Sequence, residues 1–355
     1  MPYLSIKNKN TDIYLEFKDK YIFVQGDSGE GKSLLVSMLS DEETISRDVD
    51  TDLDIRILNK LTINDFKNWN NGELIVTDEV YARKYLSSFK TKNCYFLIVT
   101  RKIFKNINFS YRSIYNLVRN DTKSKLEKAY TFSESKVDNY DYIFTEDSGY
   151  GYEFIKKCLN GYNVIGCEGK SNIKNVMSSI LNGLENKKVL LICDGGGIGT
   201  DISIIANYIR KLAKHSIEVE ILLPECFEHI LLCSGYIKYD KDIFNHFNIK
   251  YNDTESFCET KLYQFTKGTE LECSHETGTM SECWYKQCND CNNKCDYEIS
   301  TCKFDHVLKG GPAEILLELR NIITRSNNSN NNNSSNSIES LDRFNIFVSK
   351  QMNNK

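Results

Sequence analysis

The residues with the clearest chemistry lie in one glycine-rich stretch near the start of the chain. This stretch reads GDSGEGKS (26–33) and fits the pattern G-x-x-x-x-G-K-[ST]. Glycines in such a turn let backbone N–H groups converge on phosphate oxygens. A lysine at this spacing reaches the β- and γ-phosphates, and the hydroxyl after it binds Mg²⁺. The sequence therefore predicts a phosphate-binding loop formed by Gly26, Gly29, Gly31, Lys32 and Ser33.

Two acidic residues follow an apolar run further along the chain. The stretch ELIVTDE (73–79) reads as a buried strand that leads into Asp78 and Glu79. A carboxylate at such a strand end can hold Mg²⁺ through water, and its neighbour can polarise the attacking water as a general base. The alternative is that both residues only begin the next helix. We expect Asp78 to bind the metal and Glu79 to be catalytic.

Alternating strands and helices must position these residues. Strands are predicted at 21–25, 54–59, 73–79 and 94–101, and helices at 32–40, 63–69 and 80–89. Apolar strands interleaved with helices predict an α/β domain with a mainly parallel sheet that is covered on both faces. We assign this domain to residues 1–125 and expect a linker to begin in RNDTKSK (119–125).

Residues 1–120 resemble the additional-strand, catalytic-glutamate class of P-loop NTPases, which includes the AAA and ABC-type ATPases. The resemblance implies ATP and Mg²⁺ as ligands and ATP hydrolysis as the reaction. GTPases select guanine with an N/T-K-x-D element after a later strand, and the sequence has no such element there. Thr100 and Arg101, at the end of the strand 94–101, could sense the γ-phosphate, or Arg101 could simply be solvated.

A second alternation of strands and helices occupies residues 139–250 and predicts a core of its own. Its predicted strands are 141–147, 163–169, 187–197 and 217–224, and its helices are 152–161, 172–184 and 201–215. Glu146 and Asp194 stand at strand ends, so they could share Mg²⁺ for phosphodiester cleavage. The alternatives are carboxylates that only begin helices, or a phosphate held by the glycine-rich turn after Asp194.

Residues 139–235 resemble the TOPRIM domain found in topoisomerases, primases and OLD-family nucleases. Three stretches carry the resemblance: YIFTEDSGYGYEFIKKCL, VIGCEGKSNIKNVMSSIL and VLLICDGGG. A fourth, PECFEHILL (224–232), is similar to the glutamate-containing element of OLD-like proteins and makes Glu228 a further metal-ligand candidate. The D-x-D of the family becomes Asp194-Gly195-Gly196 here, so the second aspartate is missing, although Asp201 follows a few residues later.

Cysteines are concentrated in residues 251–310. Seven of the thirteen fall between Cys258 and Cys302, and Cys288-x-x-Cys291 lets two thiolates face one ion. Four ligands could hold a structural Zn²⁺ that orders a segment with few apolar residues. An iron–sulfur cluster and free thiols are the alternatives. The candidate zinc ligands are Cys273, Cys283, Cys288, Cys291, Cys295 and Cys302, with His275 and His306 within reach in sequence.

The end of the chain changes character again. Residues 311–325 predict a helix, and residues 326–355 form a tail that begins with an asparagine- and serine-rich tract. Such a low-complexity tract buries too little apolar surface to order itself. The net charge of −4 limits any nucleic-acid contact to a local patch. No signal-peptide-like or membrane-spanning run is seen, which predicts a cytoplasmic protein with no membrane partner.

Together these patterns predict an ATP-hydrolysing P-loop protein that couples its nucleotide state to a Mg²⁺-dependent, TOPRIM-like nuclease module. The combination resembles the ATPase–TOPRIM arrangement of OLD-type nucleases and related phage-defence systems. That resemblance implies nucleic acid as a substrate and a homo-oligomer as the working form. The alternative is a nucleotide-dependent switch or adaptor, whose TOPRIM-like domain has lost metal chemistry and binds a partner or nucleic acid.

Overall fold

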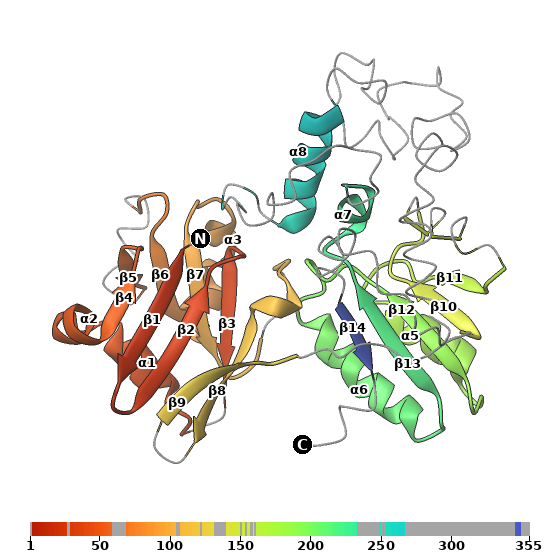
Figure 1. The fold of residues 1–355 in the computed structure, drawn as a ribbon, viewed down its shortest axis with the longest axis horizontal. Helices are drawn as coiled ribbons and strands as arrows, with labels where there is room; N and C mark the ends of the chain where they lie inside the picture. The colour runs from red at the N-terminus through yellow and green to blue at the C-terminus, as the bar shows by residue number, and fades with distance from the viewer. Residues whose placement is uncertain are drawn as a thin grey trace, which may run out of the picture. The chain divides into compact units, whose positions relative to one another are not determined.

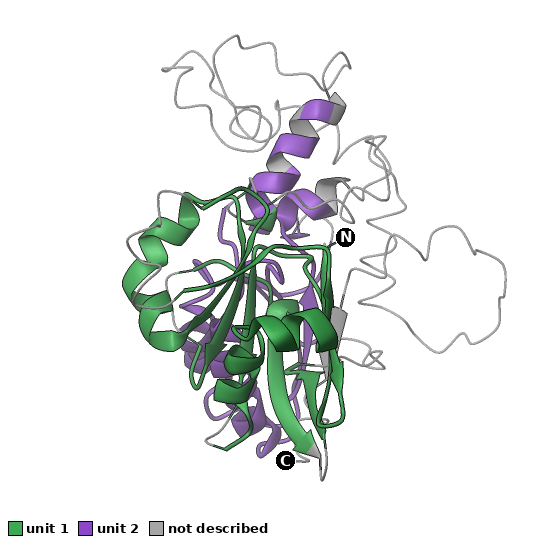
Figure 2. Cartoon of the chain, turned by 90° about the vertical axis from the view of Figure 1, so that its left-hand side faces the viewer, with its two compact units in different colours: residues 1–131, 242–254 green, residues 132–241, 255–355 purple. Residues whose placement is uncertain are grey.

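The computed structural model shows an α/β chain in two compact units (Figures 1 and 2). Unit 1 comprises residues 1–131 and 242–254, and unit 2 comprises residues 132–241 and 255–355. Within the described residues, no helix is long and apolar enough to cross a membrane. The structure describes residues 2–26, 29–58, 69–103, 107–120, 123–130, 140–149, 151–152, 155–156, 159, 161–232, 249, 251, 253–266 and 345–348.

Unit 1 is built on a mixed sheet with the strand order β4-β1-β2-β9-β8-β3-β7-β6-β5. The strands are β1 (Tyr3–Asn8), β2 (Thr11–Glu16), β3 (Tyr21–Gln25), β4 (Val49–Thr51), β5 (Ile55–Ile57), β6 (Leu74–Asp78), β7 (Tyr95–Thr100), β8 (Ile114–Asn120) and β9 (Lys123–Lys128). The helices are α1 (Lys32–Met38), α2 (Glu42–Asp48), α3 (Glu79–Lys90) and the short 3₁₀ helix η2 (Tyr111–Ser113).

The prediction of a mainly parallel sheet is correct only for the centre of unit 1. Strands β5, β6, β7, β3 and β8 run parallel to one another. Beyond them, β1 pairs antiparallel with both β2 and β4, and β8 pairs antiparallel with β9. The predicted linker start at 119–125 is wrong, because this stretch contains the end of β8 and the start of β9. Its polar residues read as a linker because both strands are only partly buried.

Helices α1 and α3 cover opposite faces of the parallel centre. Leu35 and Met38 of α1 share a buried cluster with Leu97 of β7. Phe96, the preceding residue of β7, points to the other face. There it stacks on Phe89 of α3, with ring centroids 4.4 Å apart. Full burial of one such side chain stabilises the fold by roughly 1.5–3 kcal/mol, so these contacts hold both helices against the sheet.

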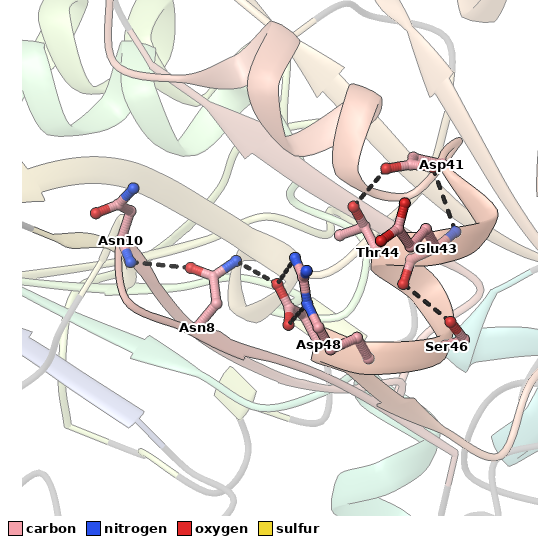
Figure 3. Close-up of polar contacts among 8 residues, drawn as sticks. Asn8, Asn10, Asp41, Glu43, Thr44, Ser46 and Asp48 are labelled. Carbon is pink, nitrogen blue, oxygen red and sulfur yellow. Dashed lines mark hydrogen bonds and ion pairs between the residues drawn. The ribbon is translucent and has the colours of Figure 1, made fainter.

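No residue of α2 is buried, and a polar contact to Asp48 joins the helix to the sheet (Figure 3). Asp41 precedes α2 and accepts a 2.6 Å hydrogen bond from the Thr44 hydroxyl. At the other end, Asp48 accepts a 3.0 Å hydrogen bond from the side-chain amide of Asn8 in β1. Hydrogen bonds from Arg47 and then Asn8 lower the pKa of Asp48.

Unit 2 is built on a second sheet with the strand order β11-β10-β12-β13-β14. Its elements are β10 (Tyr142–Thr145), β11 (Val164–Gly166), α5 (Ile173–Leu181), β12 (Lys188–Ile192), α6 (Asp201–Ala213), β13 (Glu218–Leu223), α7 (Phe227–Leu232), α8 (Thr254–Thr266) and β14 (Asn345–Val348). The first four strands of the order run parallel, as predicted. The fifth, β14, pairs antiparallel with β13.

Two predicted boundaries need correction. Residues 326–355 were expected to be a low-complexity tail, but 345–348 form β14 at the edge of the unit 2 sheet. Residues up to 250 were expected to belong to the second domain, but Ile249 packs into the buried cluster of unit 1. The predicted helices at 63–69 and 311–325 fall almost wholly outside the described residues.

Candidate functional site

The glycine-rich loop follows β3, whose first four residues are all buried. Gly29 and Gly31 have φ of +97° and +98°, a region that side-chain-bearing residues rarely occupy. Gly26 has little room, because a Cβ there would lie 2.4 Å from a carboxylate oxygen of Glu30. Asp27 and Ser28, between these glycines, lie outside the described residues. The described glycines therefore serve the loop conformation that the motif requires.

Lys32 begins α1 and reaches back across the loop. Its Nζ donates a 2.5 Å hydrogen bond to the backbone carbonyl of Gly26. Ser33 follows in the first turn of α1 and is exposed. The ammonium is thus held at the mouth of the loop, with the hydroxyl of Ser33 on the next residue. Lys32 and Ser33, the predicted phosphate and magnesium ligands, therefore lie side by side in the sequence at the start of α1.

Asp78 ends β6 and begins α3. Its Oδ1 accepts hydrogen bonds from the backbone N–H groups of Val80 (2.9 Å) and Tyr81 (3.0 Å). Asp78 therefore caps α3. Capping does not exclude metal binding through water, because both of these bonds use one oxygen of an exposed carboxylate.

Glu79 is held by groups from β7 and α3. Its Oε2 accepts hydrogen bonds from the Thr100 hydroxyl (3.0 Å) and the backbone N–H of Arg101 (3.3 Å). Its Oε1 forms a 2.9 Å ion pair with Arg83. Burial favours a higher pKa for Glu79, but these hydrogen bonds and the Arg83 charge outweigh it and lower the pKa. The carboxylate is therefore ionised at neutral pH, as a general base must be.

The strand order gathers these groups at one edge of the sheet. Strand β7 lies between β3 and β6, and all three are parallel. The loop after β3, Thr100 at the end of β7 and Asp78 at the end of β6 therefore share the carboxyl edge, where ligands of open α/β sheets bind. Sequence reasoning had named Thr100 only as a γ-phosphate sensor and had not foreseen its bond to Glu79.

In unit 2, the structure brings Glu146 and Asp194 together. Glu146 follows β10 and Asp194 follows β12, the neighbouring parallel strand. The backbone N–H of Asp194 donates a 2.9 Å hydrogen bond to Oε2 of Glu146. Both side chains are half-buried at the carboxyl edge of the sheet. The predicted pair therefore lies together at the carboxyl edge of the sheet.

Burial and neighbouring carboxylates disfavour the charged forms of this pair. Burial raises the pKa of Glu146 to about 7, against the opposing effects of the Asp194 N–H and Lys170. Burial, and then the charges of Glu146 and Glu228, raise the pKa of Asp194 well above its usual range. A cation bound between them would offset this cost.

Three other acidic residues of unit 2 differ in position. Glu228, in the first turn of α7, is buried, and its charge acts on Asp194. Asp201, at the start of α6, is also buried, and its charge acts on Glu146. Glu168 follows β11 but is exposed on a residue with φ of +57°. Glu228 and Asp201 thus belong to the surroundings of the pair, and Glu168 serves a turn.

The carboxylates of Glu146 and Asp194 are donors of the type that Mg²⁺ binds. Across the residues that the structure describes, no three His, Cys, Asp or Glu side chains are arranged as ligands of one ion. Mg²⁺ needs fewer, because it usually keeps several waters and binds one or two carboxylates together with substrate phosphates. Glu146 and Asp194 can supply those carboxylates. Gly196 still stands where the TOPRIM resemblance implies a second aspartate.

Lys170 is a member of the unit 2 site that sequence reasoning missed. It lies in the turn after β11, on the far side of β10 from β12. Its Nζ donates a 2.6 Å hydrogen bond to the carbonyl of Gly197, in the loop after β12. The side chain therefore crosses the end of β10, where its charge lowers the pKa of Glu146. The sequence does contain a signal for it, because Lys170 directly follows Gly169 in the turn after β11.

The described cysteines behave as small apolar residues. Those within the described part of the chain are buried: Cys94, Cys167, Cys193, Cys226 and Cys258. Burial raises the pKa of Cys94 to about 11 and that of Cys167 to about 12. The predicted zinc ligands, from Cys273 to Cys302, all lie outside the described residues.

Comparison with known proteins adds no identification: no protein-family model matches the chain, and no curated protein matches its sequence.

Proposed function

We propose that unit 1 binds and hydrolyses a nucleoside triphosphate, ATP in preference to GTP, together with Mg²⁺. One observation carries the proposal: the glycine-rich loop and the Asp78-Glu79 pair meet at the carboxyl edge of parallel strands, with β7 between them. An inserted strand in this position is also what the additional-strand class of P-loop NTPases implies. The missing N/T-K-x-D element favours ATP.

The residues take distinct roles in this proposal. The loop N–H groups and Lys32 would hold the phosphates, while Ser33 and Asp78 would hold Mg²⁺, directly or through water. Bound Mg²⁺ would neutralise charge on the phosphates. Glu79, ionised by its hydrogen-bonding partners, would orient and deprotonate the attacking water.

Substitution of Glu79 tests the catalytic part of this proposal. Glu79→Gln should retain ATP binding but lose hydrolysis by roughly 10²–10⁴-fold, the usual contribution of a general base. Release of inorganic phosphate from ATP by the full chain measures this loss. Glu42→Gln, at an exposed residue of α2, is the matched control. Equal turnover by Glu79→Gln and the wild type would refute the role of Glu79.

We further propose that unit 2 is a Mg²⁺-dependent phosphodiesterase module controlled by the nucleotide state of unit 1. Its support is the pair Glu146 and Asp194 on adjacent strand ends, together with the TOPRIM resemblance. Two carboxylates that hold a hard cation are what phosphodiester hydrolysis requires. Nucleic acid is the substrate class that the resemblance implies.

A specific observation favours a second candidate function. Gly196 removes the second aspartate of the TOPRIM pattern, so unit 2 could serve as an adaptor that binds a partner or nucleic acid without cutting it. The full chain with ATP, Mn²⁺ and DNA or RNA distinguishes the two. Cleavage that Glu146→Ala and Asp194→Ala abolish would exclude the adaptor. Nucleic-acid binding without cleavage would exclude the phosphodiesterase.

A further inference from the structure

The β8–β9 hairpin borders the glycine-rich loop on the side away from Asp78 and Glu79. Strand β8 pairs with β3 so that Gln25, the last residue of β3, lies opposite Asn116. A Cβ placed on Gly26 would lie 3.4 Å from the backbone oxygen of Leu117. The residues of β8 after Asn116 therefore continue alongside the loop.

One face of this hairpin points toward α1 and the loop. Leu117 of β8 belongs to the same buried cluster of unit 1 as Leu35 of α1, and the partly buried Tyr115 packs against this cluster. Side chains two residues apart on a strand share a face. Arg119, two residues beyond Leu117, therefore lies on the same face as the loop, and its side chain is exposed.

A cross-strand neighbour fixes the position of Arg119 more closely. In the ladder between β8 and β9, Arg119 lies directly opposite Ser124. A Cβ placed on Gly31, which directly precedes Lys32, would lie 3.5 Å from the Ser124 hydroxyl. Side chains of directly opposed residues lie about 4.5–5.5 Å apart at their Cβ atoms. The long side chain of Arg119 can therefore reach over the loop.

We propose that the Arg119 guanidinium binds phosphate oxygens of the nucleotide, an inference that depends on nucleotide binding by unit 1. Arginine presents paired N–H donors that match phosphate oxygens. The γ-phosphate must face Glu79, across β7, whereas Arg119 approaches from β8 on the other side of β3. Arg119 thus contacts the α- and β-phosphates, which ADP and ATP share.

The hairpin itself offers a matched control. Lys125 is an exposed cation on β9, one residue from Ser124, and it lies opposite Val118 in the ladder. It therefore points to the face away from the loop. A nonspecific effect of positive charge would act through both residues, whereas a phosphate contact requires Arg119 alone.

Calorimetric titration of the full chain with ADP and with a non-hydrolysable ATP analogue, both with Mg²⁺, tests the inference. Arg119→Ala should weaken both ligands by about tenfold, as expected for loss of a charge-assisted hydrogen bond. Arg119→Lys should recover part of this loss, and Lys125→Ala should bind both ligands as the wild type does.

Other outcomes separate this inference from the proposed function. Wild-type affinity of Arg119→Ala for both ligands, with binding still lost in Lys32→Ala, would overturn the role of Arg119 alone. Weakening of the ATP analogue but not of ADP would overturn its placement at the α- and β-phosphates. A wild-type chain that binds neither nucleotide would overturn both proposals.

Discussion

Glu79 in unit 1 and Glu146 in unit 2 both stand at the carboxyl end of a parallel strand. Their surroundings shift the pKa in opposite directions. Glu79 receives hydrogen bonds from Thr100 and Arg101 and pairs with Arg83, which together lower its pKa. Glu146 is half-buried near other carboxylates, and loss of solvation raises its pKa to about 7.

The difference indicates what each site needs from its ligands. Around Glu79 the protein supplies its own hydrogen-bond donors, so the carboxylate is ionised, as the proposed general base must be. Around Glu146, the hydrogen bond from the Asp194 N–H and the positive charge of Lys170 lower the pKa. Together they do not offset the increase that burial causes. This contrast agrees with the ligands we propose, which are a nucleotide phosphate at the first site and Mg²⁺ at the second.

The largest expected effect is the loss of metal binding when either carboxylate of the unit 2 site is removed. Glu146→Gln and Asp194→Asn should each weaken Mn²⁺ binding, measured without nucleotide, by at least about 100-fold, because loss of even an outer partner of a metal ligand costs 10–100-fold. Glu168→Gln, at an exposed acid after the neighbouring strand, should bind Mn²⁺ normally. Equal affinity in all three variants would remove the metal site from unit 2.

The pH dependence of stability should show a smaller effect of the same origin. Burial raises the pKa of Glu146 in the folded chain from its ordinary value of 4.5 to about 7. The stability that its bound proton contributes is fully present below about pH 4.5 and is lost as the pH rises to 7. Relative to Glu146→Gln, the metal-free wild type should therefore lose unfolding free energy across this window in urea titrations. Saturating Mg²⁺ should reverse the loss, and identical pH profiles would contradict the account.

The smallest expected effect is a shift in the pH profile of stability when Lys170 loses its charge. Lys170→Met removes the charge that lowers the pKa of Glu146, so the midpoint of the preceding pH profile should move to higher pH. Lys174→Met, at an exposed residue of α5, should leave the midpoint unchanged. A shift in both variants would mean that Lys170 acts through general charge rather than through its place beside Glu146.

The strands at the centre of each sheet could be predicted because they are continuous apolar runs. Strand β7 is buried at every residue and β3 at four of five, and both lie close to their predicted bounds. The half-buried hairpin β8–β9 carries Lys123, Lys125 and Glu127, so its composition indicated a linker. Strand β14 escaped prediction because only pairing with the distant β13 makes it a strand.

The candidate sites show the same limit. Motif spacing was sufficient to name Lys32, Asp78 and Glu79, since each lies within or directly after one element. The hydrogen bond of Thr100 to Glu79 and that of Lys170 to Gly197 join separate strands and loops. Such contacts depend on strand order, which no local pattern of residues specifies.

Direct binding of ATP to the full chain tests the central claim most simply. Calorimetry with ATP and Mg²⁺ should show about one nucleotide per chain for the wild type. Lys32→Ala should abolish detectable binding while its thermal unfolding stays that of the wild type. Unchanged affinity in Lys32→Ala, or no binding by a folded wild-type chain, would contradict the assignment of a phosphate-binding loop to unit 1.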